Sequence, residues 1–275
     1  MNELSLQGKW TLVTGASAGL GREMARQIAV RHGGHLILVA RRKDRLEELQ
    51  RELEPHGARV VCIAADLSRP ADVDRLFAEA TAGRDVHAAI LNAGVTYFGH
   101  HLELGHDEQE RILHTNVMSV VKLCSLLLKH QLVKTPGGGL MLISSMAGTV
   151  PTPYQAFYSG TKAFLNHYGV ALAEELKGKD VSLTVFAPGG IATEMGDKSG
   201  TSRKYKKGDV GVMEVDVCAR HALAAFIGRR RFVVPGAINR LGDFFFRFLP
   251  RATQAAFQAQ VFRSAVLPAG TPAKE

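Results

Sequence analysis

The sequence predicts an α/β fold in which one doubly wound parallel sheet has helices on both faces. Short apolar segments alternate with longer segments of helical periodicity between residues 10 and 234, as crossover connections between parallel strands require. Residues 36–40 are apolar throughout, which is typical of a strand covered on both faces. A glycine-rich turn at residues 15–21 joins the first strand to the first helix. These observations together predict a single domain.

Each element follows from its local pattern. Strands are expected at residues 10–14, 36–40, 59–64, 87–91, 140–144, 181–187 and 232–234. Helices are expected from the glycine-rich turn to residue 32, at residues 43–53, from residue 70, and at residues 107–133, 154–177 and 214–227. Pro70 favours a helix start, because the N–H that proline lacks has no partner at the first helical position.

The composition is that of a folded soluble protein, with 46% hydrophobic and 22% charged residues. Cys62, Cys124 and Cys218 lie far apart and form no C-x-x-C pair, which favours free buried thiols in a reducing, cytoplasmic compartment. The N-terminal residues lack the pattern of a signal peptide. No apolar run approaches the roughly 20 residues that a membrane-spanning helix requires.

The net charge of +8 has more than one interpretation. A solvated basic surface is preferred on net charge alone. A nucleic acid, a membrane surface or an acidic substrate are the alternatives. Outside the tail no patch of interleaved basic and aromatic residues indicates a nucleic-acid partner.

The glycine-rich turn has the spacing Thr14-Gly15-x-x-x-Gly19-x-Gly21. Glycines allow a tight turn and a close approach of backbone to ligand, and the free N–H groups of the following helix can face a pyrophosphate. The spacing differs from G-x-G-x-x-G, so the common dinucleotide fingerprint does not apply literally. A glycine-rich turn without a ligand is the alternative.

The end of the second strand indicates which dinucleotide would bind. An acidic residue there would bind the ribose 2′-hydroxyl of NAD, but the chain has Ala40 followed by Arg41. A guanidinium suits a 2′-phosphate, and Ser17 could add a hydrogen bond. The pattern therefore favours NADP over NAD. The alternative is that Arg41 and Arg42 only begin a charged helix, and the role of Arg42 is left open.

A third group consists of Ser145, Tyr158 and Lys162. If residues 154–177 are helical, Tyr158 and Lys162 lie one turn apart on the same helix face. A phenol normally keeps its proton to about pH 10, and a neighbouring ammonium group lowers that pKa. The pair is therefore a candidate general acid and base near neutral pH, and the serine could hold a carbonyl or hydroxyl group.

With Thr14-Gly15, Asn92-Ala93-Gly94, Ser145, Tyr158-x-x-x-Lys162 and Pro188-Gly189 in this order, the chain resembles the short-chain dehydrogenase/reductase family, in the branch with subunits of about this length. The resemblance covers residues 6–235. It implies a Rossmann-like sheet, with residues 1–235 as the dinucleotide-binding and catalytic domain and residues 236–275 as a C-terminal helical extension and tail. It also implies a homodimer or homotetramer in which helices 107–133 and 154–177 pair between subunits.

The resemblance implies a catalytic set of Asn116, Ser145, Tyr158 and Lys162. Tyr158 would give a proton to the substrate oxygen, and Lys162 would lower the pKa of Tyr158 and hold the nicotinamide ribose. Ser145 would orient the carbonyl group, whereas its neighbour Ser144 is expected to be structural. Asn116 would hold a water molecule that links the lysine to solvent.

The resemblance also implies the contacts of the cofactor. Asp66 would contact the adenine, Thr193 the carboxamide, and Asn92 is expected to be partly structural. The full expected set is Gly15, Ser17, Gly19, Leu20, Gly21, Arg41, Asp66, Leu67, Asn92, Ala93, Gly94, Tyr158, Lys162, Pro188, Gly189, Ile191 and Thr193. No spacing typical of a metal site occurs, and His100, His101 and His106 are interpreted as surface or rim of the substrate pocket.

Two regions are expected to determine the substrate. Residues 190–211 combine glycines with five cations, which suggests either a mobile lid that meets an acidic group or a solvated loop. In the tail, Leu241, Phe245, Phe248 and Leu249 share a helical face with Arg240, Arg247 and Arg251 around it, and Pro250 breaks that helix or starts another. Packing of this face within the protein is preferred, and the alternatives are contact with a second subunit or with an anionic membrane surface.

The leading hypothesis is an NADP(H)-dependent oxidoreductase that acts on a small-molecule carbonyl or secondary alcohol, with weak support for a lipid-like or acyl substrate. The alternative is a non-catalytic dinucleotide-binding sensor. The four catalytic positions discriminate between them, because a binding protein would not need all four.

Overall fold

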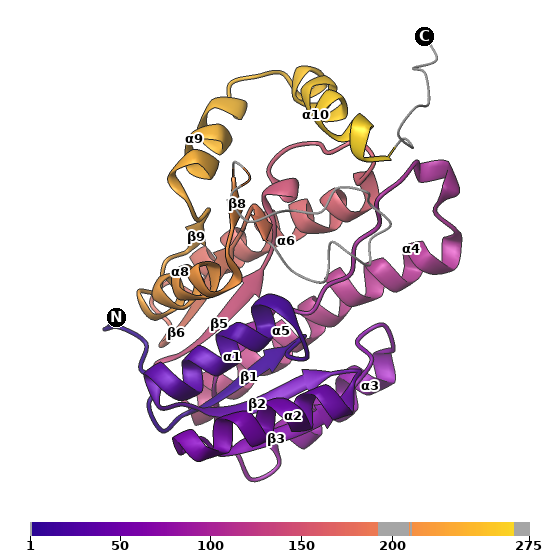
Figure 1. The fold of residues 1–275 in the computed structure, drawn as a ribbon. Coiled ribbons are helices and arrows are strands. Elements are labelled where there is room, and N and C mark those ends of the chain that lie inside the picture. Colours follow the sequence, from indigo (N-terminus) through magenta and orange to yellow (C-terminus); the bar gives the residue numbers. More distant parts are fainter. Residues whose placement is uncertain (1, 192–208, 210, 267–275) are drawn as a thin grey trace.

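The computed structural model describes residues 2–191, 209 and 211–266. The main sheet has seven parallel strands in the order β3-β2-β1-β4-β5-β6-β9 (Figure 1). The strands are β1 (Trp10–Thr14), β2 (His35–Ala40), β3 (Val60–Ala64), β4 (Val86–Leu91), β5 (Gly138–Ile143), β6 (Val181–Phe186) and β9 (Phe232–Val233). The order reverses between β1 and β4, and this reversal is where ligands of doubly wound sheets bind. The predicted fold class is confirmed.

Helices cover both faces of the sheet and enclose two hydrophobic cores (Figure 1). Helices α1 (Gly19–His32), α2 (Lys43–Leu53) and α8 (Val215–Ile227) contribute to one core. Helices α3 (Pro70–Thr81), α5 (Ser119–Lys134) and α6 (Ala156–Glu175) contribute to the other. Every residue of β4, β5 and β6 is buried, which explains why these strands are mainly apolar, with His87 in β4 and Ser182 and Thr184 in β6 as buried polar residues.

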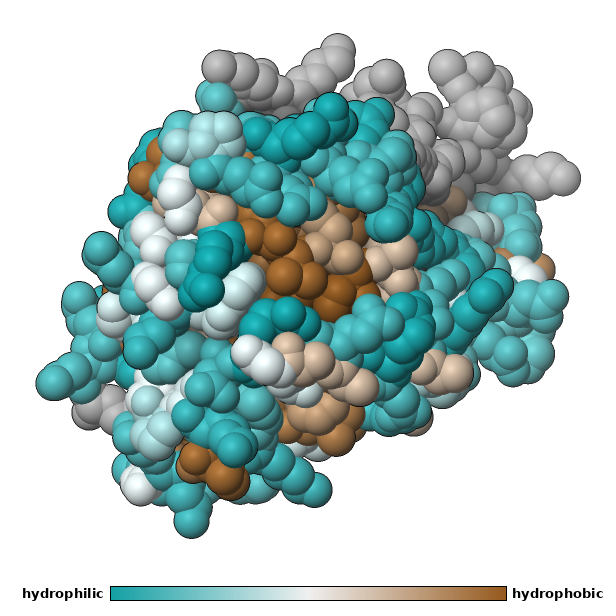
Figure 2. Space-filling model, turned by 90° about the horizontal axis from the view of Figure 1, so that it is seen from below, coloured by the Kyte–Doolittle hydropathy of each residue, from teal (hydrophilic) through white to brown (hydrophobic). Residues whose placement is uncertain are grey.

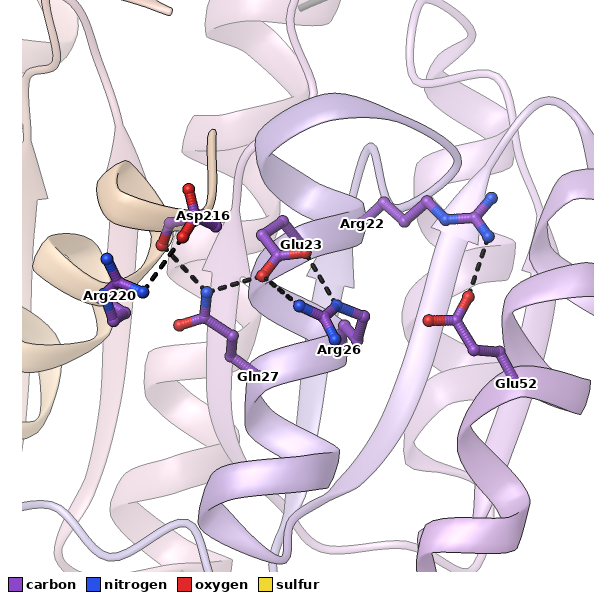
Figure 3. Close-up of polar contacts among 7 residues, drawn as sticks. All are labelled: Arg22, Glu23, Arg26, Gln27, Glu52, Asp216 and Arg220. Carbon is purple, nitrogen blue, oxygen red and sulfur yellow. Dashed lines mark hydrogen bonds and ion pairs between the residues drawn. The ribbon is translucent and has the colours of Figure 1, made fainter. Parts of the chain in front are cut away.

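Polar contacts fix α1 between its two neighbours (Figure 3). The Gln27 amide donates to the Asp216 carbonyl of α8 at 3.0 Å and to the Glu23 carboxylate at 2.7 Å. Arg22 forms ion pairs with Glu48 and Glu52 of α2. Exposed pairs of this kind contribute little stability, so the apolar core supplies most of the packing energy.

The predicted helix at residues 107–133 is interrupted. It consists of α4 (His106–Leu113), a π-helical turn η3 (His114–Met118) and α5. By length and hydropathy the whole segment His106–Lys134 could cross a membrane. However, 56% of its most apolar 18-residue stretch is buried inside the protein. Its apolar character is therefore explained by its place in the core.

The chain after β6 contains elements that the sequence did not reveal. Strands β7 (Gly190–Ile191) and β8 (Val212–Met213) form a small parallel sheet. The lid proposed for residues 190–211 falls mostly outside the described residues and stays a prediction. The tail forms two helices, α9 (Ala237–Phe246) and α10 (Arg251–Val266), separated at Pro250 as expected.

The preferred interpretation of the tail helix is wrong, because its apolar face does not pack within the protein. Leu241, Phe245 and Phe248 are exposed on α9 and the residues after it. The face of the molecule opposite the tail is mostly hydrophilic, with its largest hydrophobic area enclosed near the centre (Figure 2).

Candidate active site

The predicted site residues lie where the central strands of the sheet end. Thr14 ends β1, Asn92 follows β4, Ser145 follows β5 and Pro188 follows β6. Helix α6 carries Tyr158 and Lys162 back to the same edge. The fold thus brings together segments that are far apart in the sequence.

The glycine-rich turn is closely packed against the end of β4. Gly15 and Gly19 have left-handed φ angles of 69° and 55°. A Cβ atom on Gly21 would lie 2.4 Å from the Gly15 carbonyl oxygen and 2.5 Å from the Asn92 amide nitrogen. The turn therefore requires glycine at these positions, and the backbone N–H groups at the start of α1 form a cradle that fits a pyrophosphate.

Thr14 and Asn92 join the two strands at the reversal point. The Thr14 hydroxyl accepts hydrogen bonds from the backbone N–H groups of Asn92 (2.9 Å) and Ala93 (3.0 Å). The Asn92 side-chain amide donates to the Thr14 carbonyl at 3.0 Å. Asn92 therefore has the structural role that was expected for it.

We expect Gly21→Ala to destabilise the protein and to weaken dinucleotide binding. The added methyl group would displace either the Gly15 carbonyl or the Asn92 amide, and overpacking of this kind costs about 1–3 kcal/mol. Urea unfolding and nucleotide titration would measure both effects. Gly160→Ala is the matched control, because that helical position has open space around it. The control should be stabilised by about 0.5–1 kcal/mol, and equal destabilisation of both variants would contradict the packing argument.

Arginine and serine side chains meet beside this turn. The Arg42 guanidinium donates to the Ser17 hydroxyl at 3.2 Å. Arg41 is exposed, and its charge acts on Asp66. Burial raises the pKa of Asp66, but hydrogen bonds from Ser68 and the charge of Arg41 outweigh it, so the net pKa is lowered. The side chain at Ser17 is therefore that of Arg42, the residue whose role the sequence left open.

Asp66 is held in a turn of its own. Its carboxylate accepts hydrogen bonds from the backbone N–H (3.0 Å) and the hydroxyl (2.8 Å) of Ser68. The next residue, Leu67, is buried in the core. The turn fixes the carboxylate at the end of β3, close to the charge of Arg41.

Lys162 is fully buried at the centre of the site. Its ammonium group donates to the Ile143 carbonyl at 2.9 Å and lies 5.7 Å from the centre of the Tyr158 ring. Burial lowers the pKa of Lys162 from 10.5 to about 8. The predicted pairing of Tyr158 and Lys162 on one face of α6 is consistent with this geometry.

Two contacts fix the backbone of Lys162. The Ser144 hydroxyl donates to the Lys162 carbonyl at 3.0 Å, which gives Ser144 the structural role expected of it. A Cβ atom on Gly148 would lie 2.4 Å from the Lys162 carbonyl carbon. The short helix η4 (Met146–Gly148) therefore packs directly on α6.

Because the ammonium group of Lys162 is buried, we expect the free energy of unfolding of the cofactor-free protein to depend on pH differently from that of its Lys162→Met variant. Below about pH 8 the folded protein bears the full cost of burying the charge. Between pH 8 and 10.5 the folded protein loses this proton while the unfolded chain keeps it, so the free energy of unfolding rises with pH. Urea unfolding should show the wild type gaining up to roughly 3 kcal/mol relative to the variant across this range. A difference independent of pH would contradict the prediction.

Ser145 begins η4. Its hydroxyl oxygen accepts a hydrogen bond from the Ala147 N–H at 3.1 Å, and the Met146 N–H donates to the Pro188 carbonyl at 2.9 Å. The first bond caps the N-terminus of η4. The second bond joins this turn to the segment that follows β6.

Asn116 lies within the π-helical turn and is completely buried. Its side-chain oxygen accepts from the Val95 N–H at 2.9 Å, and its amide donates to the Val95 carbonyl (2.9 Å) and the Thr161 hydroxyl (3.1 Å). The Asn116 oxygen and the Lys162 nitrogen each lie 3.5 Å from the Cβ position of Gly94. The two side chains therefore converge on Gly94.

The turn after β6 is held by a residue that the sequence did not single out. A Cβ atom on Gly189 would lie 2.7 Å from the Asn239 amide nitrogen, and that amide donates to the carbonyls of Gly211 and Pro235 at 3.3 Å. Ile191 is half-buried in β7. Thr193 lies outside the described residues.

A small pocket opens beside Tyr158 and is lined mainly by aromatic side chains. Tyr97, His101, Tyr154 and Phe157 contribute to it. The Phe98 ring contacts Phe262 of α10 at 5.5 Å between ring centres. Among the residues that the structure describes, no group of three or more His, Cys, Asp or Glu side chains could hold a metal ion.

The sequence-based prediction did not assign a site role to Arg42, Asn239 or the aromatic pocket residues Tyr97, Tyr154 and Phe157. Arg42 was visible as the second arginine after β2, but Asn239 has no recognisable motif. Tyr154 has a left-handed φ of 64°, so α6 begins only at Ala156.

Comparisons with known proteins agree with this geometry. A family model described as short chain dehydrogenase matches residues 9–204. Very-long-chain 3-oxoacyl-CoA reductase of Neurospora crassa is 38% identical over 186 residues, which are 65% of this chain and 55% of that protein. The 17-beta-hydroxysteroid dehydrogenase type 3 of Rattus norvegicus is 32% identical over 215 residues, which are 77% of this chain and 69% of that protein.

Among solved structures, a short-chain dehydrogenase from Sphingobium yanoikuyae in complex with NADPH is similar. The TM-score is 0.77 at 26% identity, and the match covers 96% of this chain and 98% of the other. The chain thus spans little more than half of the fungal relative and nearly all of the bacterial structure.

Proposed function

Because the chain belongs to the short-chain dehydrogenase/reductase family, we propose that it is an NADP(H)-dependent oxidoreductase acting on a carbonyl group or secondary alcohol. The observation that carries the proposal is the convergence of Tyr158, Lys162 and Asn116 beside a glycine cradle. Relatives of similar sequence are named as reductases and dehydrogenases, which supports the same class of reaction.

Each catalytic residue has a role that its environment supports. Bound NADPH would supply the hydride. Tyr158 would donate a proton to the carbonyl oxygen as negative charge develops there, and Ser145 would donate a hydrogen bond to the same oxygen. The Ser145 hydroxyl oxygen accepts from the Ala147 N–H, and this bond leaves the O–H able to donate toward the substrate.

Lys162 and Asn116 would maintain the protonation of Tyr158. The ammonium group lies near the Tyr158 ring and would stabilise a phenolate. Asn116 is fixed by Val95 and Thr161, so we assign it the task of orienting a water molecule beside Lys162. Proton exchange with solvent would follow this route.

The preference for NADP rests on the arginines after β2. Two cations after β2 support this preference: Arg42 donates to the Ser17 hydroxyl, and exposed Arg41 lies near Asp66. We propose that both would meet the 2′-phosphate. The remaining cofactor contacts are proposed for Gly15, Gly19, Leu20, Gly21, Leu67, Asn92, Ala93, Gly94, Pro188, Gly189, Ile191 and Thr193.

We propose a bulky apolar substrate, such as a lipid-like ketone or an acyl thioester. The aromatic lining of the pocket beside Tyr158 supports this choice, as do the names of the fungal reductase and the rat dehydrogenase. The test is a screen of NADPH oxidation against ketones, aldehydes, acyl thioesters and steroids, with NADH in parallel. Failure of every carbonyl compound to oxidise either cofactor would refute the proposal.

The proposed assembly is a homodimer or homotetramer, with the enzyme in the cytoplasm and in peripheral contact with a membrane. Leu113 and Met118 on the α4–α5 segment and Phe164 and Val170 on α6 are exposed apolar residues, which supports pairing through these helices. Light scattering would measure the mass in solution, and a monomeric mass would count against the pairing.

A further inference from the structure

Helix α9 has its apolar and polar sides inverted relative to an ordinary surface helix. Its one fully buried residue is an acid, Asp243, with 5% exposure. The outward residues are apolar, with Phe245 at 60% and Phe248 just beyond the helix at 73% exposure. We call this surface the outer face of α9. It comprises Ile238, Leu241, Phe244, Phe245, Phe248 and Leu249.

The inner side of α9 is held in place by polar contacts. The Asn239 amide donates to the carbonyls of Gly211 and Pro235, and Asp243 is paired with Arg247. Gln254 of α10 donates to the carbonyls of Phe246 (2.7 Å) and Leu249 (2.8 Å) at the end of α9. Rotation of the helix to bury its phenylalanines would break these contacts. The outer face therefore remains available to a partner outside the subunit.

The charges around this face identify the kind of partner. Arg240, Arg247 and Arg251 are exposed beside the apolar residues. Between residues 237 and 251 the acid is Asp243, which is buried and already paired. A second copy of the chain would bring these arginines against their own equivalents, which disfavours a two-fold interface here. Apolar side chains bordered by cations are suited to the headgroup region of an anionic bilayer.

We propose that the outer face of α9 docks on the surface of an anionic membrane. Its phenylalanines would enter the headgroup boundary while the arginines contact lipid phosphates and acidic headgroups. Docking would explain why six large apolar side chains on α9 and just beyond it lie together in solvent.

The docking surface is connected to the substrate pocket. Phe246 of α9 contacts Phe257 of α10, and Phe262 of α10 contacts Phe98 beside the pocket. The pocket includes the neighbouring residues Tyr97 and Gly99. Helix α10 therefore links α9 to the edge of the pocket. Building on the proposed function, the substrate class is a carbonyl compound that partitions into the membrane.

Vesicle sedimentation tests the docking directly. Wild-type protein should bind vesicles of phosphatidylcholine and phosphatidylglycerol, bind pure phosphatidylcholine weakly, and be released by high salt. Arg240→Gln combined with Arg251→Gln should lower the affinity about 30-fold, from about 1 kcal/mol per cation. Phe245→Ser combined with Phe248→Ser should lower it by at least about 10-fold.

Val30→Ser is the matched control, because Val30 is an exposed apolar residue near the end of α1 and does not belong to the outer face of α9. The control should bind vesicles as the wild type does. Absence of wild-type binding to anionic vesicles, or unchanged binding of the Phe245/Phe248 variant, would overturn the proposal. Light scattering that shows a dimer dissociated by the same variant would instead assign the outer face to self-association.

Activity assays separate this inference from the proposed function. The Phe245/Phe248 variant should reduce a water-soluble ketone at the wild-type rate but lose most of its activity toward a lipophilic ketone presented in anionic vesicles. If the variant and the wild type reduce the vesicle-bound ketone at equal rates, delivery of the substrate from the membrane is refuted. If the wild type reduces no ketone but still binds vesicles, the proposed function fails and the docking surface stands.

Discussion

Replacement of Tyr158 by Phe is expected to lower kcat by roughly 100- to 10,000-fold while NADPH binding remains measurable. The change removes one hydroxyl group, the proposed proton donor, and general acid catalysis is worth about this factor. The aromatic ring and its position 5.7 Å from the Lys162 ammonium group would be retained. Steady-state kinetics with a ketone identified by the screen would measure kcat, and fluorescence titration would measure NADPH affinity.

Tyr97→Phe provides the matched control for this experiment. Tyr97 lines the same pocket, and its hydroxyl donates to the His100 carbonyl at 3.3 Å, so the control removes a phenol from the same surroundings. We expect a change in KM and a kcat close to that of the wild type. If Tyr158→Phe turns over as fast as Tyr97→Phe, another group supplies the proton.

Replacement of the arginines after β2 should convert the cofactor preference. Arg41→Ala and Arg42→Ala are each expected to weaken NADPH binding by about 10- to 100-fold, because a charged hydrogen bond to a phosphate contributes roughly 1.5–3 kcal/mol. NADH binding should change little, because NADH carries no 2′-phosphate. The two dissociation constants, measured for each variant, give the change in preference.

Arg45→Ala is the control for this pair. Arg45 lies one turn further along α2 and forms an exposed ion pair with Glu48, so its removal should leave both cofactors unaffected. An unchanged NADPH affinity in both Arg41→Ala and Arg42→Ala would show that NADP specificity has been assigned wrongly. A loss in Arg42→Ala alone would move the phosphate contact from the predicted Arg41 to the residue beside Ser17.

The sheet could be predicted because the burial of each strand is visible in the strand's own residues. Buried parallel strands are mainly apolar, and residues 36–40, which are apolar throughout, show this directly. The interruption at His114–Met118 could not be predicted, because one extra residue in a helical turn leaves the apolar pattern on either side unchanged. The short strands β7 and β8 contain two residues each, which is too few for a period to be recognised.

The site was predictable where the chemistry depends on residue type and spacing, as for Tyr158 and Lys162. It was not predictable where tertiary contacts decide. The placement of Arg42 beside Ser17 depends on the side-chain directions at the end of β2. The contact of Asn239 with Gly189 depends on how a helix from the tail folds back. The sequence revealed the amphipathic pattern around Phe245, but a pattern alone does not say which side of a helix faces the protein.

The hydrogen bonds between Thr14 and Asn92 also bear on how the protein folds during synthesis. They join residues separated by 78 positions in the chain, so the glycine cradle cannot be completed before β4 has left the ribosome. The first three strands contain no substitute for Asn92, although they are adjacent to one another in the sheet. A fragment that ends after β3 would therefore lack a finished nucleotide crevice. The growing chain cannot gain stability from its cofactor until about a third of its length has emerged.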